Sequence, residues 1–496
     1  MTTRDTRGGS SPWTVAIVGA GVSGICSAIK LREAGITDFV ILEKAASIGG
    51  TWRDNTYPGA ACDVRSHFYS FSFEPNPDWS RVYSPQPEIL AYFERCVAKY
   101  GVSPHIRFNQ EVTAATFDED RGLWCLAMGD GTSVEARTLI LGCGQLNRPA
   151  FPAIEGRESF AGPAFHSARW DHTVDLAGKR VASIGNGASA IQYVPEVARE
   201  AGHLTVFQRS ANWIVAREDR PYTEAEKQRF RNVPLARLLA RWKIYLVNEY
   251  DFLAFLKESW LRRRREKAIK AWLEEVIPDP ALRATQTPDY PLGCKRILVS
   301  SDYFPALNRP NVDVVTSPIT RIRPDGIETA DGAFTALDVI IYGTGFETMS
   351  FVGPIAVTGR DGRHLDEAWS HGAEAHLGIT VAGFPNLFVC YGPNTNLGHH
   401  SIIFMIECQV RYIVACIREI VERDLAVLDV REEAMARFNR EVQDAMKKTV
   451  WEGGCHSWYK TADGKVTNNW SGPIIQYWMK TRRPDFTEYE EVPRRA

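Results

Sequence analysis

The order of apolar and polar residues near the N-terminus predicts a strand, a helix and a second strand. Residues 15–18 form a short apolar run rich in valine and isoleucine, as is typical of a buried strand. A glycine-rich turn, residues 19–24, follows at once, and apolar residues then recur at helical spacing. The second strand, residues 39–42, ends at Glu43. This is the order of a βαβ unit.

The same pattern occurs again in the middle of the chain. Residues 181–184 predict a strand, 185–190 a turn, 191–199 a helix and 204–207 a second strand that ends at Gln208-Arg209. The two turns begin 166 residues apart, at Gly19 and Gly185. That spacing indicates a duplicated architecture and not a short-period repeat.

The remaining pattern divides the chain into five segments. Residues 138–142 predict a strand that returns to the first sheet, and the proline-containing stretch 147–152 predicts a crossing to a second unit. Residues 221–280 are rich in Leu, Trp, Arg, Lys and Glu and predict inserted helices, after which strands are expected at 312–315 and 339–342. We therefore expect an α/β protein with two Rossmann-like dinucleotide-binding domains and a helical insertion. The expected boundaries are 1–150 and 336–496 for the first domain, 151–220 and 289–335 for the second, and 221–288 for the insertion.

Composition and charge exclude several classes of protein. With 496 residues the chain is expected to form two or three packed units, and 44% hydrophobic residues with a formal charge of −2 are typical of a globular protein. The near-neutral charge gives no case for nucleic acid, and the basic run 262–265 is expected to be the solvated face of a helix. The apolar stretch 402–417 contains Glu407 and Arg411, which predicts a buried helix and no membrane span. The N-terminal residues lack the apolar segment of a secretory signal, and the ten cysteines include no CxxC pair, so we expect reduced thiols in the cytoplasm.

The first glycine turn has the residues that a dinucleotide requires. Gly19 permits the tight turn, Gly21 lets the backbone approach a pyrophosphate, and Gly24 lets helix and strand pack closely. The phosphates would lie at the positive end of the helix. Glu43, 19 residues after Gly24, is placed to accept hydrogen bonds from a ribose hydroxyl.

The second turn indicates a different nucleotide. Gly185, Gly187 and Ser189 form the turn, and Arg209 with Ser210 stands where the first unit has its acidic residue. A guanidinium can pair with a 2′-phosphate, which a carboxylate would repel, so this position favours NADPH over NADH. An exposed arginine at a strand end is the alternative.

Two dinucleotide sites on one chain indicate electron transfer from a nicotinamide to a flavin, so the expected cofactors are FAD and NADPH. A disulfide reductase would need a close redox pair of cysteines, which the sequence lacks. A non-catalytic dinucleotide sensor would not need two complete sites, although the sequence alone leaves it open.

A longer motif precedes the second unit. Residues 160–171 contain Phe160, Gly162, His166, Trp170 and Asp171 at the spacing FxGxxxHxxxW followed by Asp. This segment resembles the fingerprint of the Baeyer–Villiger monooxygenases, and the resemblance runs from Val15 to about Trp470. In that family the histidine is thought to link domain movements and not to act on substrate. Ordinary packing residues of an interdomain segment are the alternative.

The resemblance implies roles for further residues. Thr51, Trp52 and Asp63 fall in segments that look like the flavin-side loops of the family, Gly345 falls in a second flavin-contacting motif, and Trp458 falls in a segment that closes over the cofactor. Arg296 matches the essential arginine of the family, and Lys295 precedes it. The alternatives are a turn cap for Asp63, a surface ion pair for Arg296, a solvent-facing Lys295 and a core position for Trp458.

The implied reaction is oxygen insertion next to a ketone carbonyl, giving an ester or lactone. In the family, reduced flavin and oxygen form a C4a-peroxyflavin, which a fixed cation such as Arg296 would keep deprotonated while Asp63 holds that cation in place. The implied partners are NADPH, molecular oxygen and a small ketone. Ile297, Ala61, Ser167 and Ser471 depart from the common family pattern, which leaves the substrate open. Oxygenation of nitrogen or sulfur is the alternative reaction.

Overall fold

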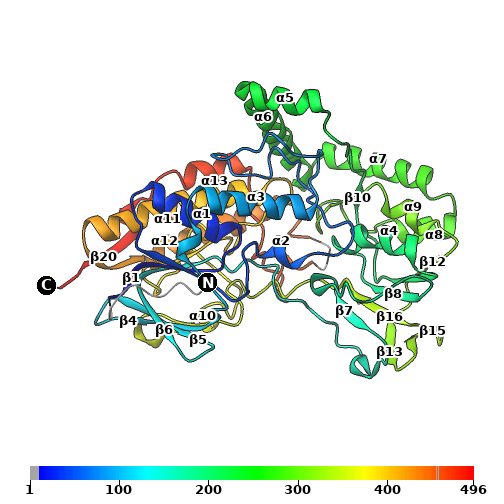
Figure 1. Ribbon diagram of the computed structural model, residues 1–496, viewed down its shortest axis with the longest axis horizontal. Helices are drawn as coiled ribbons and strands as arrows, with labels where there is room; N and C mark the ends of the chain where they lie inside the picture. Colours follow the sequence, from blue (N-terminus) through cyan, green and yellow to red (C-terminus); the bar gives the residue numbers. More distant parts are fainter. Residues whose placement is uncertain (1–10, 454, 456, 496) are drawn as a thin grey trace.

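The computed structural model describes residues 11–453, 455 and 457–495. It consists of two lobes, the first built on a mixed sheet and the second on a parallel one (Figure 1). The first sheet has the strand order β17-β4-β5-β6-β1-β2-β3, with β18 paired to β6. Its central strands are parallel, while β4 and β5 form an antiparallel pair. The bounds of its strands are β1 Trp13–Val18, β2 Phe39–Glu43, β3 Ile106–Phe108, β4 Val112–Asp118, β5 Leu123–Met128, β6 Ser133–Leu141, β17 Ala356–Thr358 and β18 Leu387–Val389.

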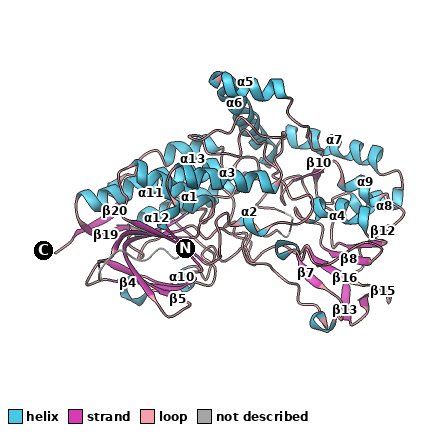
Figure 2. Cartoon of the chain, in the orientation of Figure 1, coloured by secondary structure: helices cyan, strands magenta, loops and turns pink. Residues whose placement is uncertain are grey.

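Long helices cover one face of this sheet (Figure 2). The longest of them is α11, whose apolar positions pack against α1 and into the first core. The expected buried helix at 402–417 is therefore confirmed. The helices of the chain are α1 Val22–Glu33, α2 Thr51–Asp54, α3 Gln86–Lys99, α4 Ala190–Glu200, α5 Glu224–Asn232, α6 Pro234–Asp251, α7 Trp260–Val276, α8 Pro280–Gln286, α9 Tyr303–Leu307, α10 Leu365–Ala368, α11 Ile402–Glu422, α12 Glu432–Met446 and α13 Ile474–Lys480. The single-turn helices are η1 Ser103–His105, η2 Arg157–Ser159, η3 Ser167–Arg169, η4 Phe252–Phe255, η5 Arg360–Gly362 and η6 Phe486–Glu488.

The second sheet is fully parallel, in the order β12-β9-β8-β16-β7. Its strands are β7 Ala164–His166, β8 Arg180–Ile184, β9 His203–Phe207, β12 Val312–Val315 and β16 Val339–Tyr342. Because β16 pairs with both β7 and β8, this sheet extends past the boundary expected at residue 336. The physical reason is that β16 lies between β8 and β7, where its four buried residues fill the core. Antiparallel strands β13 Ile319–Arg323, β14 Gly326–Thr329 and β15 Phe334–Ala336 form a separate small sheet, as do β19 Leu425–Val430 and β20 Tyr489–Pro493.

The helical insertion projects from the top of the molecule as α5 and α6 and continues as α7 and α8 (Figure 1). The first and last residues of the insertion join the second lobe at points that lie close together. The short strands β10 Ile214–Val215 and β11 Leu298–Val299 pair in parallel on its two sides. The Trp213 indole donates a hydrogen bond of 2.7 Å to the carbonyl of Tyr290. The expected basic solvated face is only partly present, since Arg262 and Arg265 pair with Glu266 and Asp251 whereas Arg263 and Arg264 are exposed.

The cysteines depart from the expectation of reduced thiols. Cys294 and Cys455 form a disulfide across 161 residues of sequence, and the other eight cysteines are free. The spacing of the cysteines in the sequence does not predict this disulfide, because the loops that carry Cys294 and Cys455 meet only in the folded chain. Among the described residues, no helix is both long and apolar enough to cross a bilayer.

Candidate functional site

A cavity of 1770 Å³ lies between the two lobes, and both glycine turns line it. The predicted site residues at its wall come from every part of the chain and are Gly19, Gly21, Glu43, Thr51, Trp52, Asp63, Gly185, Gly187, Ser189, Arg209, Ser210, Lys295, Arg296, Gly345 and Trp458. Residues separated by more than 400 positions in sequence thus share one space. Gly24 and the 160–171 motif lie outside this wall.

The first turn is shaped by the absence of side chains. Gly19 has a φ of 98°, a left-handed conformation that favours glycine, and a Cβ on Gly24 would lie 1.9 Å from the Gly19 carbonyl oxygen. No side chain caps the N-terminus of α1 at Gly21, so its free N–H groups are available to an anion. Glu43 is buried and accepts hydrogen bonds from the amides of Ala20 and Ala45 at 2.8 and 2.9 Å. Its carboxylate therefore also fixes the turn itself.

The second turn carries a cluster of positive charge. Gly185 has a φ of 104°, and no atom lies within 4 Å of the position that a Cβ on Gly187 would occupy. The ammonium of Lys295 donates a hydrogen bond of 3.0 Å to the hydroxyl of Ser210. Burial, and next the positive charge of Arg209, lower the pKa of Lys295. Two cations and a hydroxyl so placed form a site for a small dianion, and the structure brings Lys295 to Arg209 instead of leaving it alone in solvent.

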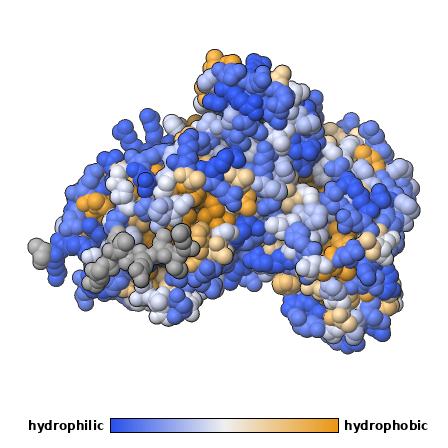
Figure 3. Space-filling view, in the orientation of Figure 1, coloured by the Kyte–Doolittle hydropathy of each residue, from blue (hydrophilic) through white to orange (hydrophobic). Residues whose placement is uncertain are grey.

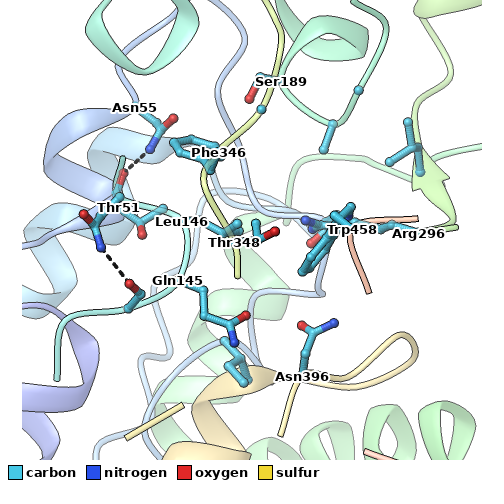
Figure 4. Close-up of a pocket in the computed structure, with 18 of the residues that line it drawn as sticks. Thr51, Asn55, Gln145, Leu146, Ser189, Arg296, Phe346, Thr348, Asn396 and Trp458 are labelled. Carbon is cyan, nitrogen blue, oxygen red and sulfur yellow. Dashed lines mark hydrogen bonds and ion pairs between the residues drawn. The ribbon is translucent and has the colours of Figure 1, made fainter. Parts of the chain in front are cut away.

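Arg296 and Asp63 form an ion pair at the cavity wall. The negative charge of Asp63 is the largest cause of the raised pKa of Arg296, so the guanidinium keeps its proton. The Arg296 side chain retains 36% exposure, and this exposure faces the cavity. Figure 4 shows it beside Trp458. The pair is thus neither a turn cap nor an ordinary surface salt bridge.

Two polar residues of the loop after β18 complete this wall. The Tyr391 hydroxyl donates a hydrogen bond of 2.7 Å to the side-chain oxygen of Asn396, whose amide in turn donates to Asn469 at 2.6 Å. Burial raises the pKa of Tyr391 to about 12, so its hydroxyl stays protonated. Asn396 points into the same space as Gln145 (Figure 4).

Trp458 is half-buried and lines the cavity, so it is not a core residue. Its ring lies 4.5 Å from that of Tyr459 between centroids. The Cys294–Cys455 disulfide ties this C-terminal segment to the loop that carries Lys295 and Arg296. Neither cysteine belongs to the described cavity wall, which argues against disulfide chemistry on a bound substrate.

The 160–171 motif has a structural place beside the site. A Cβ on Gly162 would lie 2.4 Å from the carbonyl oxygen of Asp338, which explains the glycine. The ring of His166 packs edge-on against Phe346, directly after the lining residue Gly345, and burial lowers its pKa to about 4. Trp170 packs on Tyr193, which packs on Tyr57, six residues before Asp63.

Several wall residues were missed by the sequence analysis. Gln145 is buried and neither polar atom of its side chain has a partner among the described residues. The rings of His399 and His400 also lack hydrogen-bond partners there, and burial lowers their pKa values to about 3 and about 2. The available signal was a polar run, residues 394–400, directly after Gly392-Pro393 in an otherwise apolar region. No short motif relates that run to the glycine turns.

The residues of the two glycine turns fit the binding of two dinucleotides. Each turn presents an uncapped helix N-terminus and glycines whose missing side chains leave room for a phosphate. The Arg209–Lys295 cluster has the charge to hold a phosphate beyond those of the pyrophosphate. The Gln145 amide, which has no partner among the described residues, can offer donors and an acceptor to a polar ring system.

Comparisons with known proteins agree with this geometry. A family model described as pyridine nucleotide-disulphide oxidoreductase matches residues 16–233. A Baeyer–Villiger monooxygenase of Streptomyces coelicolor is 46% identical over 96% of this chain and 92% of that protein. One from Pseudomonas aeruginosa is 43% identical over 99% of this chain and 93% of that protein. The crystal structure of OTEMO in complex with FAD and NADP has a TM-score of 0.88 at 27% identity, covering 97% of this chain and 100% of the other.

Proposed function

The chain belongs to the Baeyer–Villiger monooxygenase family, and we infer that it uses FAD, NADPH and molecular oxygen to convert a ketone to an ester or lactone. The observation that carries this conclusion is Arg296, a permanent cation held by Asp63 at a cavity that both dinucleotide turns share.

We propose that FAD binds the first turn and NADPH the second. Gly19, Gly21 and the N-terminus of α1 would hold the FAD pyrophosphate, with Glu43 at the ribose. Thr51, Trp52, Gly345 and Gln145 would surround the flavin ring. Gly185, Gly187 and Ser189 would hold the NADPH pyrophosphate, and a 2′-phosphate would lie between Arg209, Ser210 and Lys295.

Bound FAD, once reduced by NADPH, supplies the activated oxygen. Arg296 binds the ketone oxygen and stabilises the negative charge that develops there, because arginine does not lose its proton at working pH. Asp63 positions the guanidinium and is itself a positioning residue. Tyr391 keeps its proton and donates a hydrogen bond to the side-chain oxygen of Asn396, so this part of the wall is held in place and stays uncharged.

The C-terminal segment that contains Trp458 and Tyr459 would exclude water from the cavity. Trp458 and Tyr459 place aromatic surface beside Arg296, which lowers the local dielectric and strengthens each charge interaction. We further propose a cytoplasmic location, because eight of the ten cysteines are free, as a reducing compartment favours, while Cys294 and Cys455 alone are paired.

Product analysis tests the reaction class. Purified enzyme receives NADPH, isotopically labelled oxygen and a panel of linear, cyclic and aryl ketones, and products are identified by mass spectrometry. An ester or lactone with one labelled oxygen atom is the expected result. Consumption of NADPH that yields only hydrogen peroxide across the panel would contradict the ketone assignment.

Arg296→Ala separates this reaction from oxygenation of nitrogen or sulfur. We expect ester formation to fall by roughly a hundredfold or more, since a buried charge-assisted contact to the reacting oxygen is lost. Reduction of FAD by NADPH should persist. If a sulfide or amine is oxygenated and the variant retains that activity in full, the alternative reaction is the main one.

A further inference from the structure

The face of α6 that points away from the protein is apolar along its whole length. Its exposed side chains include Leu239 at 59%, Trp242 at 53% and Leu246 at 61% exposure. The full set on α6 and its flanks is Val233, Leu235, Leu238, Leu239, Trp242, Leu246, Val247, Tyr250 and Leu253, which we call the α6 stripe. Between residues 232 and 256, Lys243 is the one exposed charged residue.

Helical geometry aligns most of these side chains. At about 100° per residue, the α6 members from Leu235 to Tyr250, apart from Val247 at the edge, fall within an arc of roughly 120°. The opposite face docks on the first lobe, where Ile244 and Tyr245 are buried and Arg241 donates hydrogen bonds to the carbonyls of His67 and Ser70. The stripe is therefore a surface that the fold holds in place, and large apolar patches of this kind mark interaction sites.

Charge indicates what the stripe contacts. Residues 221–288 contain 14 basic and nine acidic side chains, a formal charge of +5, whereas the whole chain has −2 and the remainder thus −7. Figure 3 shows apolar side chains at the tip of this projection next to hydrophilic ones. In a symmetric dimer built on this face, each +5 segment would meet its own copy and be repelled. An anionic surface is attracted by the same charge.

We propose that the α6 stripe docks on the surface of an anionic lipid bilayer. Leucine side chains beside tryptophan and tyrosine, with the exposed Lys243 at their edge and a segment of net positive charge around them, are typical of helices that lie in the bilayer interface. Val247, at the edge of the stripe, also lines the cavity, as do Asn248 next to it and Asp251 one turn further. The docked surface thus adjoins the site, which suits a ketone that partitions into lipid. This last point rests on the proposed function, while the docking does not.

Vesicle sedimentation tests the docking without any activity readout. FAD-loaded enzyme is mixed with one of two kinds of vesicle, made either of pure phosphatidylcholine or of phosphatidylcholine with about 30% phosphatidylglycerol. The fraction of protein bound to the vesicles is measured after centrifugation. We expect binding to the anionic vesicles only, weakened by salt. Leu239→Glu with Trp242→Glu should lower the partition constant by roughly tenfold or more, because two apolar anchors are lost and negative charge is added.

Val421→Glu is the matched control, an exposed apolar residue at the end of α11, and should bind vesicles as the unchanged protein does. Turnover of a water-soluble ketone reports whether each variant is folded, since none of these residues lines the cavity. Failure of both vesicle types to bind the protein would overturn the proposal. An equal loss of vesicle binding in the Val421→Glu control would also overturn it. A dimer by light scattering that Trp242→Glu dissociates, without vesicle binding, would assign the stripe to a second copy.

Discussion

At the scale of single residues, the site depends on charges that are held where water would otherwise screen them. The negative charge of Asp63 raises the pKa of Arg296, whereas burial, and next the positive charge of Arg209, lower the pKa of Lys295. Lys295 and Arg296 are consecutive, and they contact Ser210 of the second turn and Asp63 of the first lobe. One short loop therefore contributes to the proposed 2′-phosphate site and to the proposed catalytic wall.

Removal of the positive charge at the second turn should change the choice between NADPH and NADH. Arg209→Ala is expected to raise KM for NADPH by roughly tenfold to a hundredfold, because a charge-assisted contact to the 2′-phosphate is lost. KM for NADH should change little. Arg323→Ala, an exposed ion-paired arginine on the neighbouring β13, should alter neither value. Equal effects on both nucleotides would remove Arg209 from the phosphate site.

Asp63→Asn tests the positioning of Arg296. The amide keeps the size of the side chain but removes its charge, so the guanidinium loses its fixed partner. We expect the share of consumed NADPH that yields ester to fall by roughly tenfold, with hydrogen peroxide rising in proportion. Asp63→Glu should restore part of the ester yield. A variant that leaks no peroxide would show that Arg296 is held by other contacts.

At the scale of elements, both βαβ units could be predicted because their signals are local. Strand, glycine turn and helix follow one another within about thirty residues, so hydrophobic period and turn chemistry were sufficient. Asn396 and His399 could not be placed in that way, because their roles depend on where the loop after β18 lies relative to β6 and α11. The boundary at residue 336 stays a prediction, and the pairing of β16 with β7 and β8 of the second sheet is a contact that its own sequence does not indicate.

The disulfide between two loops should affect how tightly the site closes. Cys455→Ser frees the segment with Trp458 from the loop with Arg296, so we expect faster cleavage near residue 455 in limited proteolysis and more hydrogen peroxide per NADPH. Cys125→Ser, at a free and partly buried cysteine of β5, is the control. Identical cleavage and coupling in the two variants would mean that the segment is held by packing alone.

At the scale of the whole molecule, buried histidines make stability sensitive to acid. Burial lowers the pKa values of His67, His166 and His376 to about 4, and those of His399 and His400 further. Their unfolded pKa is about 6.5, so below that pH the unfolded chain binds more protons than the folded one. Stability conferred by the neutral rings is present above pH 6.5 and is lost as pH falls toward 4.

Thermal unfolding between pH 7 and pH 5 measures this effect. Each such histidine is expected to lower the free energy of unfolding by about 1.4 kcal/mol per pH unit once the pH is below 6.5. His400→Gln should reduce the pH dependence of Tm relative to the unchanged protein, since one proton-binding group is removed. A Tm that stays constant from pH 7 to pH 5 would contradict the burial of these rings as neutral groups.

The close entry and exit of the helical insertion have a consequence for how such enzymes diversify. Because Trp213 and Tyr290 touch and β10 pairs with β11, residues 221–288 form a cassette with a narrow junction. Relatives could exchange this cassette by recombination while the two sheets and Arg296 stay in register. Val247, Arg265 and Ile269 belong to the cassette and also to the cavity wall. A single exchange would therefore transfer the outer surface and part of the substrate preference together.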